Sequence, residues 1–382
     1  MVAVAVDFLE VVGGFLLPCL FFYRLIMKFK NILSYSFFIW TLFGWGLFSI
    51  CAADDMQKML ALSGCRQRTG TGKKVVLISG DEEYRSEEVL PQLAKILSQQ
   101  HGFDCVVLFA IHPETGTVDP NFRHNIPGLQ HLQDANVMVI ATRFRDLPET
   151  QMRRIDDYLK RGGPVIGMRT ATHGFNIPLG KTYSHYGNGY EGDHSFWQGG
   201  FGRAILGEKW ISHHGAHREE STRGLISPQE KNNPIVRGIK KGDIWGPTDV
   251  YGVRLPLPGD SQTVVFGQVL SGMKPTDPPV AGRKNNPLMP IAWTKSYQLP
   301  GQQSQKGKVF TTTMGSSNDF LSEGVRRLIV QGIFWACGLE KSIPLQGLRV
   351  DIVPPYHPTD FGFRSDEDWV NKNIKPGDFK QP

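Results

Sequence analysis

Cysteine is scarce in this chain, and long runs of one charge are absent. The five cysteines among 382 residues are too widely spaced to indicate a disulfide framework or a cysteine-ligated zinc site. No run of five or more Lys and Arg residues occurs, and 42 basic against 36 acidic side chains give a formal charge of only +6. We therefore expect no nucleic-acid partner. Internal repeats are also absent, and glycine and proline are too few to indicate disorder.

A long apolar run occurs only near the start of the chain. From Met27 the sequence has a basic beginning, an apolar core over residues 32–50 and small residues at 51–53. This order is typical of a signal peptide, and we expect cleavage after Ala53 and a periplasmic or secreted protein. Residues 1–26 are interpreted as an extension upstream of the true start. The alternative is an uncleaved leader, which would then be the chain's only contact with a membrane.

The remaining residues alternate between strand and helix patterns. Short apolar runs predict strands and amphipathic stretches predict helices, in the order strand 73–80, helix 86–102, strands 105–110 and 136–143, helix 147–161 and strand 165–168. This alternation predicts an α/β fold of the Rossmann or flavodoxin type, a three-layer sandwich with a mostly parallel sheet. Later strands are expected at 263–270, 289–294 and 308–314, with a last helix at 320–336.

The boundaries follow from the same patterns. We expect a leader at 1–53, a linker at 54–72, one domain at 73–340 and an irregular C-terminal arm at 341–382. Residues 181–225 are rich in glycine, histidine and aromatic side chains without periodicity, which indicates a long functional insertion.

The stretch GGPVIGMRTATHGF, residues 162–175, is the most informative motif. A helix stop at two glycines is followed by a buried strand and then by a sharp polar turn. Open α/β sheets bind ligands at such strand-to-helix elbows, so a site is expected from Arg169 to His173.

The same stretch resembles the ThuA-like (trehalose utilisation) family, and three later segments agree with it. These are LGEKWISHHG at 206–215, NPIVRGIKKGDIWGPTDVY at 233–251 and the segment 290–338, which ends in Trp-Ala-Cys-Gly. The resemblance covers about 73–340. It implies a class I glutamine amidotransferase-like fold and a role linked to sugar utilisation.

The chain departs from the family pattern at three places. Arg169 and Ser316 stand where the family usually has histidines, and Asp249-Val250 stands where it usually has an Asp-Glu pair. In glutaminase-like relatives of this fold the elbow carries a cysteine nucleophile. Arg169 cannot act as a nucleophile, so a cysteine-dependent glutaminase is excluded.

Candidate site residues come from the elbow and from the matched segments. His173 is proposed as an acid or base, with Glu83 and Asp249 as its catalytic partners. Substrate-binding roles are expected for a second set, in which a guanidinium, hydroxyls and imidazoles would hold sugar oxygens: Arg169, Thr170, His194, His213 and Tyr251. For Arg169 a buried salt bridge is the alternative, and for His173 a hydrogen bond to a backbone carbonyl.

Six histidines lie within 45 residues, from His173 to His217. Their spacing aligns no ligand set on a helix or strand, so we assign no metal ligands and predict no cofactor, with a divalent metal as the alternative. Three functions remain open: a carbohydrate- or keto-sugar-modifying enzyme, a non-catalytic sugar-binding protein, and a metal-dependent hydrolase that uses His185, His194, His213 and His214.

Overall fold

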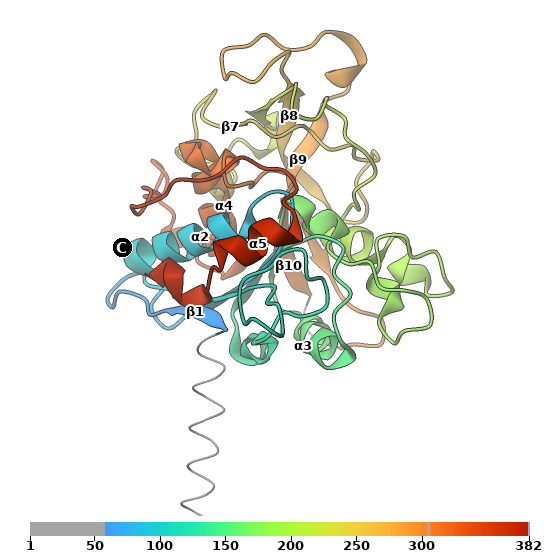
Figure 1. The fold of residues 1–382 in the computed structure, drawn as a ribbon. Helices are drawn as coiled ribbons and strands as arrows, with labels where there is room; N and C mark the ends of the chain where they lie inside the picture. The colour runs from blue at the N-terminus through green and yellow to red at the C-terminus, as the bar shows by residue number, and fades with distance from the viewer. Residues whose placement is uncertain (1–57, 304–305, 381–382) are drawn as a thin grey trace, which may run out of the picture. The chain divides into compact units, whose positions relative to one another are not determined.

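The computed structural model describes residues 58–303 and 306–380 (Figure 1). The expected leader, with its signal peptide and cleavage point, lies outside the described residues. Within the described residues, no helix combines the length and the apolar character that a bilayer crossing needs.

A ten-stranded sheet forms the centre of the described chain, in the order β1-β3-β2-β4-β5-β10-β9-β8-β6-β7. The strands are β1 Met59–Leu62, β2 Lys74–Gly80, β3 Asp104–Leu108, β4 Val137–Thr142, β5 Val165–Met168, β6 Thr222–Ile226, β7 Trp245–Gly246, β8 Gln262–Val269, β9 Met289–Tyr297 and β10 Gly307–Thr312. The pairs from β3 to β10 are parallel. β1 and the strands beyond β10 pair antiparallel.

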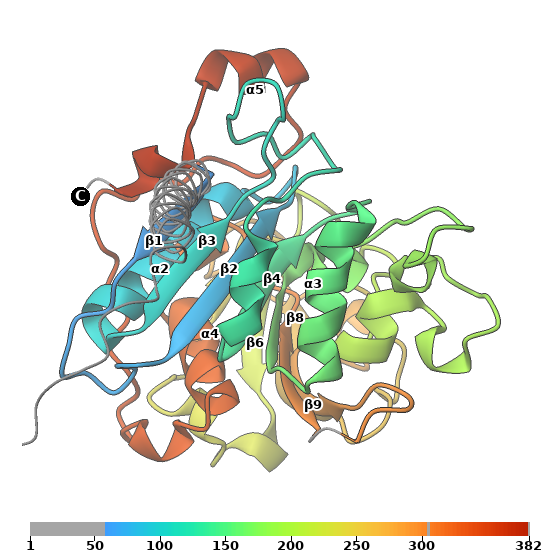
Figure 2. The ribbon, with the colours of Figure 1, turned by 90° about the horizontal axis from the view of Figure 1, so that it is seen from below.

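Helices cover both faces of this sheet (Figure 2). The α-helices are α2 Ser86–His101, α3 Glu149–Lys160, α4 Glu323–Ala336 and α5 Asp366–Lys372. Successive residues of a strand point to opposite faces of the sheet and so belong to two separate hydrophobic cores. In β2, Val75 and Leu77 pack with α2 and α4, whereas Val76 and Ile78 pack with α3. The three-layer α/β fold expected from the sequence is confirmed.

Local sequence explains where α2 begins and ends. Glu87 and Glu88 lie in its first turn, where acidic side chains complement the helix dipole. Gly102 caps its C-terminus in a left-handed conformation with φ 82°, which glycine adopts without strain.

Two expected boundaries differ from the structure. The expected linker 54–72 contributes β1, which pairs with β3 along Met59–Leu62. The expected irregular arm contains α5, whose Ser365 forms a capping box with Asp368. The C-terminal arm, drawn in red in Figure 1, runs beside α2. There Gln92 and Gln100 of α2 donate hydrogen bonds to carbonyl groups of the arm.

The insertion 181–225 contains only short helical turns before β6, as expected for a long loop. These are η3 Ser184–Tyr186, η4 Ser195–Trp197 and η5 Gly202–Leu206. Many of its aromatic rings, including Tyr186, Trp197 and Phe201, are buried against the α3 face of the sheet.

Candidate active site at the β5 elbow

The turn after β5 has a strained backbone. Arg169, the first residue of the short helix η2 (Arg169–His173), has φ 43°, a region that residues with a side chain seldom occupy. Arg85, after β2, and Phe144, after β4, are also left-handed, with φ 60° and 49°. Strain of this kind persists where the surroundings enforce it, and it gathers at functional sites.

The Arg169 side chain is buried, and both of its terminal nitrogens donate to other residues of the protein, whereas Nε has no hydrogen-bond partner among the described residues. Arg169 is 1% exposed, and Nη2 donates to Oδ1 of Asp249 over 2.9 Å. Nη1 donates to the backbone carbonyls of Asp249 and Thr313. The guanidinium also lies between the rings of Tyr84 and Tyr251, 4.3 and 3.8 Å from their centroids. Of the two roles expected for Arg169, the structure gives it the buried salt bridge.

Asp249 in turn orients two histidines. Its Oδ2 lies 2.7 Å from Nδ1 of His213, and its Oδ1 lies 3.2 Å from Nδ1 of His217. Burial raises the pKa of Asp249, but the Arg169 charge and the two histidine contacts outweigh it and leave that pKa well below its usual range. The ionised carboxylate only accepts hydrogen bonds, so His213 Nδ1 donates to it and Nε2 is the ring nitrogen left for another partner.

The two imidazole rings are partly exposed, whereas the carboxylate that orients them is buried. The side chains of His213 and His217 are 38% and 27% exposed, whereas the Asp249 side chain is fully buried. Backbone pairing between His213 and Tyr251 brings the two sequence segments together. We call the group Glu83, Arg169, His173, His213, His217, Asp249 and Tyr251 the elbow site.

Glu83 completes the polar surface of the elbow site. Its Oε1 lies 3.5 Å from Nε2 of His217, and its Oε2 lies 3.4 Å from Nε of Arg143. Its neighbour Glu82 accepts hydrogen bonds from three arginines, Arg123, Arg143 and Arg145. Of these two acidic residues, Glu83 is therefore the one that faces the histidines.

Thr170 and His173 lie beneath the surface. Thr170 is fully buried and donates to Asp81 over 2.7 Å, although a substrate contact was expected. His173 is 3% exposed and packs against the rings of Phe144 and Trp210. Burial, followed by the charges of Arg143 and Arg169, lowers the pKa of His173 well below its ordinary value. The neutral ring thus supports the exposed histidines from below.

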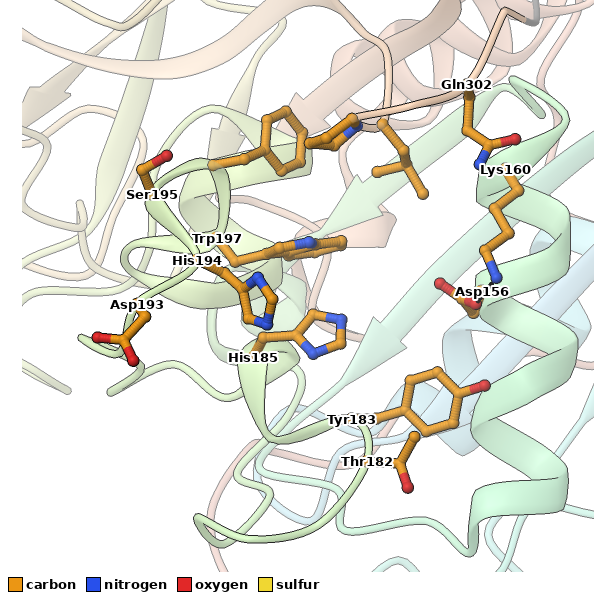
Figure 3. Close-up of a pocket in the computed structure, with 13 residues that line it drawn as sticks. Asp156, Lys160, Thr182, Tyr183, His185, Asp193, His194, Ser195, Trp197 and Gln302 are labelled. Carbon is orange, nitrogen blue, oxygen red and sulfur yellow. Dashed lines mark ion pairs between the residues drawn. The ribbon is translucent and has the colours of Figure 1, made fainter.

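His194 belongs to a different place in the fold. It lines a cleft of about 550 Å³ between α3 and the insertion, together with His185, Trp197 and Tyr183 (Figure 3). Asp156 and Lys160 of α3 border the same cleft and form an ion pair over 2.7 Å. Among the described residues, those that line this cleft include no member of the elbow site. The expected grouping of His194 with His213 is not found.

Within residues 58–303 and 306–380, one group of side chains could hold a divalent metal. His213, His217 and Asp249 each offer a ligand atom within 4.8 Å of the others. Two imidazole nitrogens and one carboxylate suit zinc and related transition metals. The expected metal set is not assembled, because His185 and His194 lie in the cleft and His214 Nε2 contacts the Lys284 carbonyl.

Sequence reasoning missed three contributors to this region. His217 was counted among the clustered histidines but given no role. Arg143 is the last residue of the predicted strand 136–143 and directly follows the observed β4, a position where ligand-facing residues are common. Trp210, whose ring lies 5.7 Å from that of His213, was noted only as one of the insertion's aromatic residues.

The chain is similar to known proteins in both sequence and fold. A family model described as ThuA, trehalose utilisation, matches residues 74–336. A protein from Bacteroides uniformis described as ThuA-like has 13% identity and a TM-score of 0.42, over 71% of this chain and 94% of that one. One from Parabacteroides merdae has 18% identity and a TM-score of 0.40, over 78% and 98%. The search of curated proteins found no match.

Proposed function

We propose that this protein, because it belongs to the ThuA family of trehalose-utilisation proteins, acts on a carbohydrate or keto-sugar at the elbow site. His213 is the group that exchanges a proton with a sugar hydroxyl or carbonyl. Glu83 and His217 form the second polar pair, and Arg169 and His173 hold the site from beneath. The signal-peptide pattern at the start of the chain supports a periplasmic or secreted location.

The observation that carries this proposal is the chain of contacts from Arg169 through Asp249 to His213. Arg169 keeps Asp249 ionised, and the carboxylate holds the proton of His213 on Nδ1. The Nε2 atom of a 38% exposed ring is then ready to accept a proton from a bound hydroxyl. A carboxylate that fixes the tautomer of a catalytic histidine is a recurrent arrangement in hydrolases.

An aromatic side chain beside the histidines suits a sugar ligand. The half-buried ring of Trp210 lies 5.7 Å from that of His213, whereas Tyr251, at 5.8 Å, is 2% exposed and covers Arg169. Trp210 Nε1 is buried and makes no hydrogen bond with the described residues. Aromatic faces pack on the apolar face of a pyranose while polar groups bind its hydroxyls.

A metal-dependent hydrolase is the second candidate, favoured by the grouping of His213, His217 and Asp249. A cation bound by these three residues would polarise a sugar oxygen or activate a water molecule. The Arg169 charge on the same carboxylate weakens this candidate, because it already neutralises the anion that would attract the metal.

The test compares His213→Ala and Asp249→Asn with the wild type, using trehalose and its keto derivatives as substrates. We expect both changes to lower kcat by roughly 10²–10⁴-fold, since a positioned acid or base contributes about that much. His214→Asn is the matched control. The His214 ring nitrogen Nε2 contacts the Lys284 carbonyl, which lies outside the elbow site, so this variant should retain wild-type turnover.

The outcomes separate the three classes of function. Turnover that persists in His213→Ala contradicts the proposed base. A wild type that binds trehalose without converting it is a sugar-binding protein. Zinc or manganese that copurifies with the wild type but is lost from Asp249→Asn identifies the metal-dependent hydrolase.

A further inference from the structure

The C-terminal arm reaches the elbow site, although the family match ends at residue 336. The ring of Phe361 lies 5.4 Å from that of His217 and stacks on Tyr84, also at 5.4 Å with an interplanar angle of 25°. Phe361 is 9% exposed. A residue outside the conventional domain thus packs directly on one of the two oriented histidines.

Hydrogen bonds to the site fix the backbone of the arm at this point. The Gly362 amide donates to the Glu83 carbonyl over 2.7 Å, and Arg85 Nη2 donates to the Gly362 carbonyl. Arg218 Nη2 donates to the Phe361 carbonyl over 3.0 Å. Gly362 has φ 139°, a backbone conformation that residues with a side chain rarely adopt, so this position favours glycine.

Contacts on both sides of this segment hold it in place. Thr359 donates to the carboxylate of Glu88 on α2. On the other side, Asn121 donates to the Arg364 carbonyl and to Asp366 in the first turn of α5. A segment tied down before and after Phe361 is a fixed wall rather than a mobile lid.

Phe363 is an exposed aromatic ring on this wall. It is 63% exposed and lies against the guanidinium of Arg143 at 5.0 Å, while Phe144 lies 4.8 Å from the same guanidinium. Glu82 and Glu83 hold Arg143 in turn. A large apolar side chain that is both exposed and held in position is typical of a binding surface.

We propose that the arm residues Phe361 and Phe363 form one wall of the elbow site, on which the substrate's second ring is bound. Phe361 is a positioning residue for His217. Phe363 and Arg143 stack on the flat apolar face of a second sugar ring or of an aromatic aglycone. The ligand class is therefore a glycoside rather than a free monosaccharide. This inference rests on the proposed carbohydrate function of the site.

Calorimetric titration of the full chain tests the role of Phe363. The probes are phenyl glucoside, trehalose and glucose, and the variants are Phe363→Ala and, as a matched control, Leu345→Ala, which alters an 82% exposed apolar residue of the same arm. We expect Phe363→Ala to bind phenyl glucoside and trehalose roughly three- to tenfold more weakly, with glucose and the control unchanged. Equal affinities in Phe363→Ala and the wild type would overturn the stacking role.

A second measurement tests Phe361 without any sugar. Phe361→Leu keeps an apolar side chain, and NMR follows the ¹⁵N resonances of the histidine rings, which report hydrogen bonding and tautomer and respond little to the ring current of the lost phenyl group. We expect the His217 ¹⁵N resonances to move and those of His124, on a different surface loop, to stay. Unmoved His217 signals would contradict the positioning role. If the wild type binds none of the sugar probes, both the carbohydrate function and the role of Phe363 are overturned. The His217 signals still decide the role of Phe361 in that case.

Discussion

Arg169 shows how the side chain at a strand-to-helix elbow limits the chemistry that the elbow can perform. Here the elbow presents a guanidinium that turns inward and is buried. Its charge is compensated by Asp249 and its faces are covered by Tyr84 and Tyr251. The elbow therefore acts through Asp249 on the histidines of a neighbouring segment.

Replacing Arg169 with Lys tests this supporting role. A lysine cannot bridge Asp249 and Thr313 while it stacks between two rings, so the buried carboxylate loses part of its compensation. We expect the free energy of unfolding in urea to fall by about 3 kcal/mol. Arg153→Lys, at an exposed pair with Glu149 on α3, should change it by less than about 0.5 kcal/mol. A small loss at Arg169 would mean that the ion pair does not stabilise the fold.

Sequence patterns predicted part of the candidate site and missed the rest for physical reasons. Asp249, His213 and Tyr251 were expected to converge with the elbow, and the structure brings them together. Thr170 and His173 follow the strand closely, but their burial depends on Asp81 and on the rings of the insertion, which spacing cannot reveal. The contact of Phe361 with His217 joins residues 144 positions apart, and no local pattern marks it.

At the scale of elements, the β2–α2 connection buries acidic side chains. Glu87, in the first turn of α2, is 1% exposed, and its nearest cation is Arg85 at 3.4 Å. Burial, partly offset by the Arg85 charge, raises the pKa of Glu87 from 4.5 to about 7. Burial and the charge of Glu82 likewise raise the pKa of Asp81 to about 6. Both groups bind a proton more tightly in the folded protein than in the unfolded chain.

A raised acid pKa makes stability fall as pH rises. Glu87 binds its proton more tightly in the folded state, so its contribution is fully present below about pH 4.5 and is lost as pH approaches 7. We expect Glu87→Gln to be more stable than the wild type by up to about 3 kcal/mol at pH 8, with little difference at pH 4.5. Urea unfolding at the two pH values measures this, with Glu149→Gln as the exposed control. If the stability difference between Glu87→Gln and the wild type were the same at both pH values, the buried Glu87 carboxyl could not be its cause.

Strands that are buried on both faces were the elements best predicted from sequence. Continuous apolar runs mark β2, β4 and β5, and the stop at Gly102 marks the end of α2. β1 was missed because only its first two residues are buried, unlike the four of β5, and it depends on pairing with β3. β7 was missed because it is only two residues long. β6 carries Arg223 and Gly224 in a half-exposed pattern that resembles a loop.

At the scale of the whole molecule, the sheet joins two halves of different construction. Its parallel strands, β3 to β10, position the elbow, whereas β9, β8, β6 and β7 extend the sheet by antiparallel pairing. The segment before β6 supplies the histidines, and the segment after β7 supplies Asp249. The elbow site therefore needs both halves, which explains why no single contiguous motif contains it.

The arm is the last part of this assembly, and its removal tests whether the family domain is complete without it. Its side chains Leu348, Val350, Phe361 and Trp369 are each less than 10% exposed. At about 1.5–3 kcal/mol for each buried apolar side chain, their loss removes roughly 6–12 kcal/mol, which approaches the whole stability of a typical domain. We expect a fragment ending at Gly338 to lose its cooperative thermal transition, whereas one ending at Lys380 keeps the wild-type Tm. A shorter fragment that melts cooperatively near that Tm would mean that the arm only covers a self-sufficient domain.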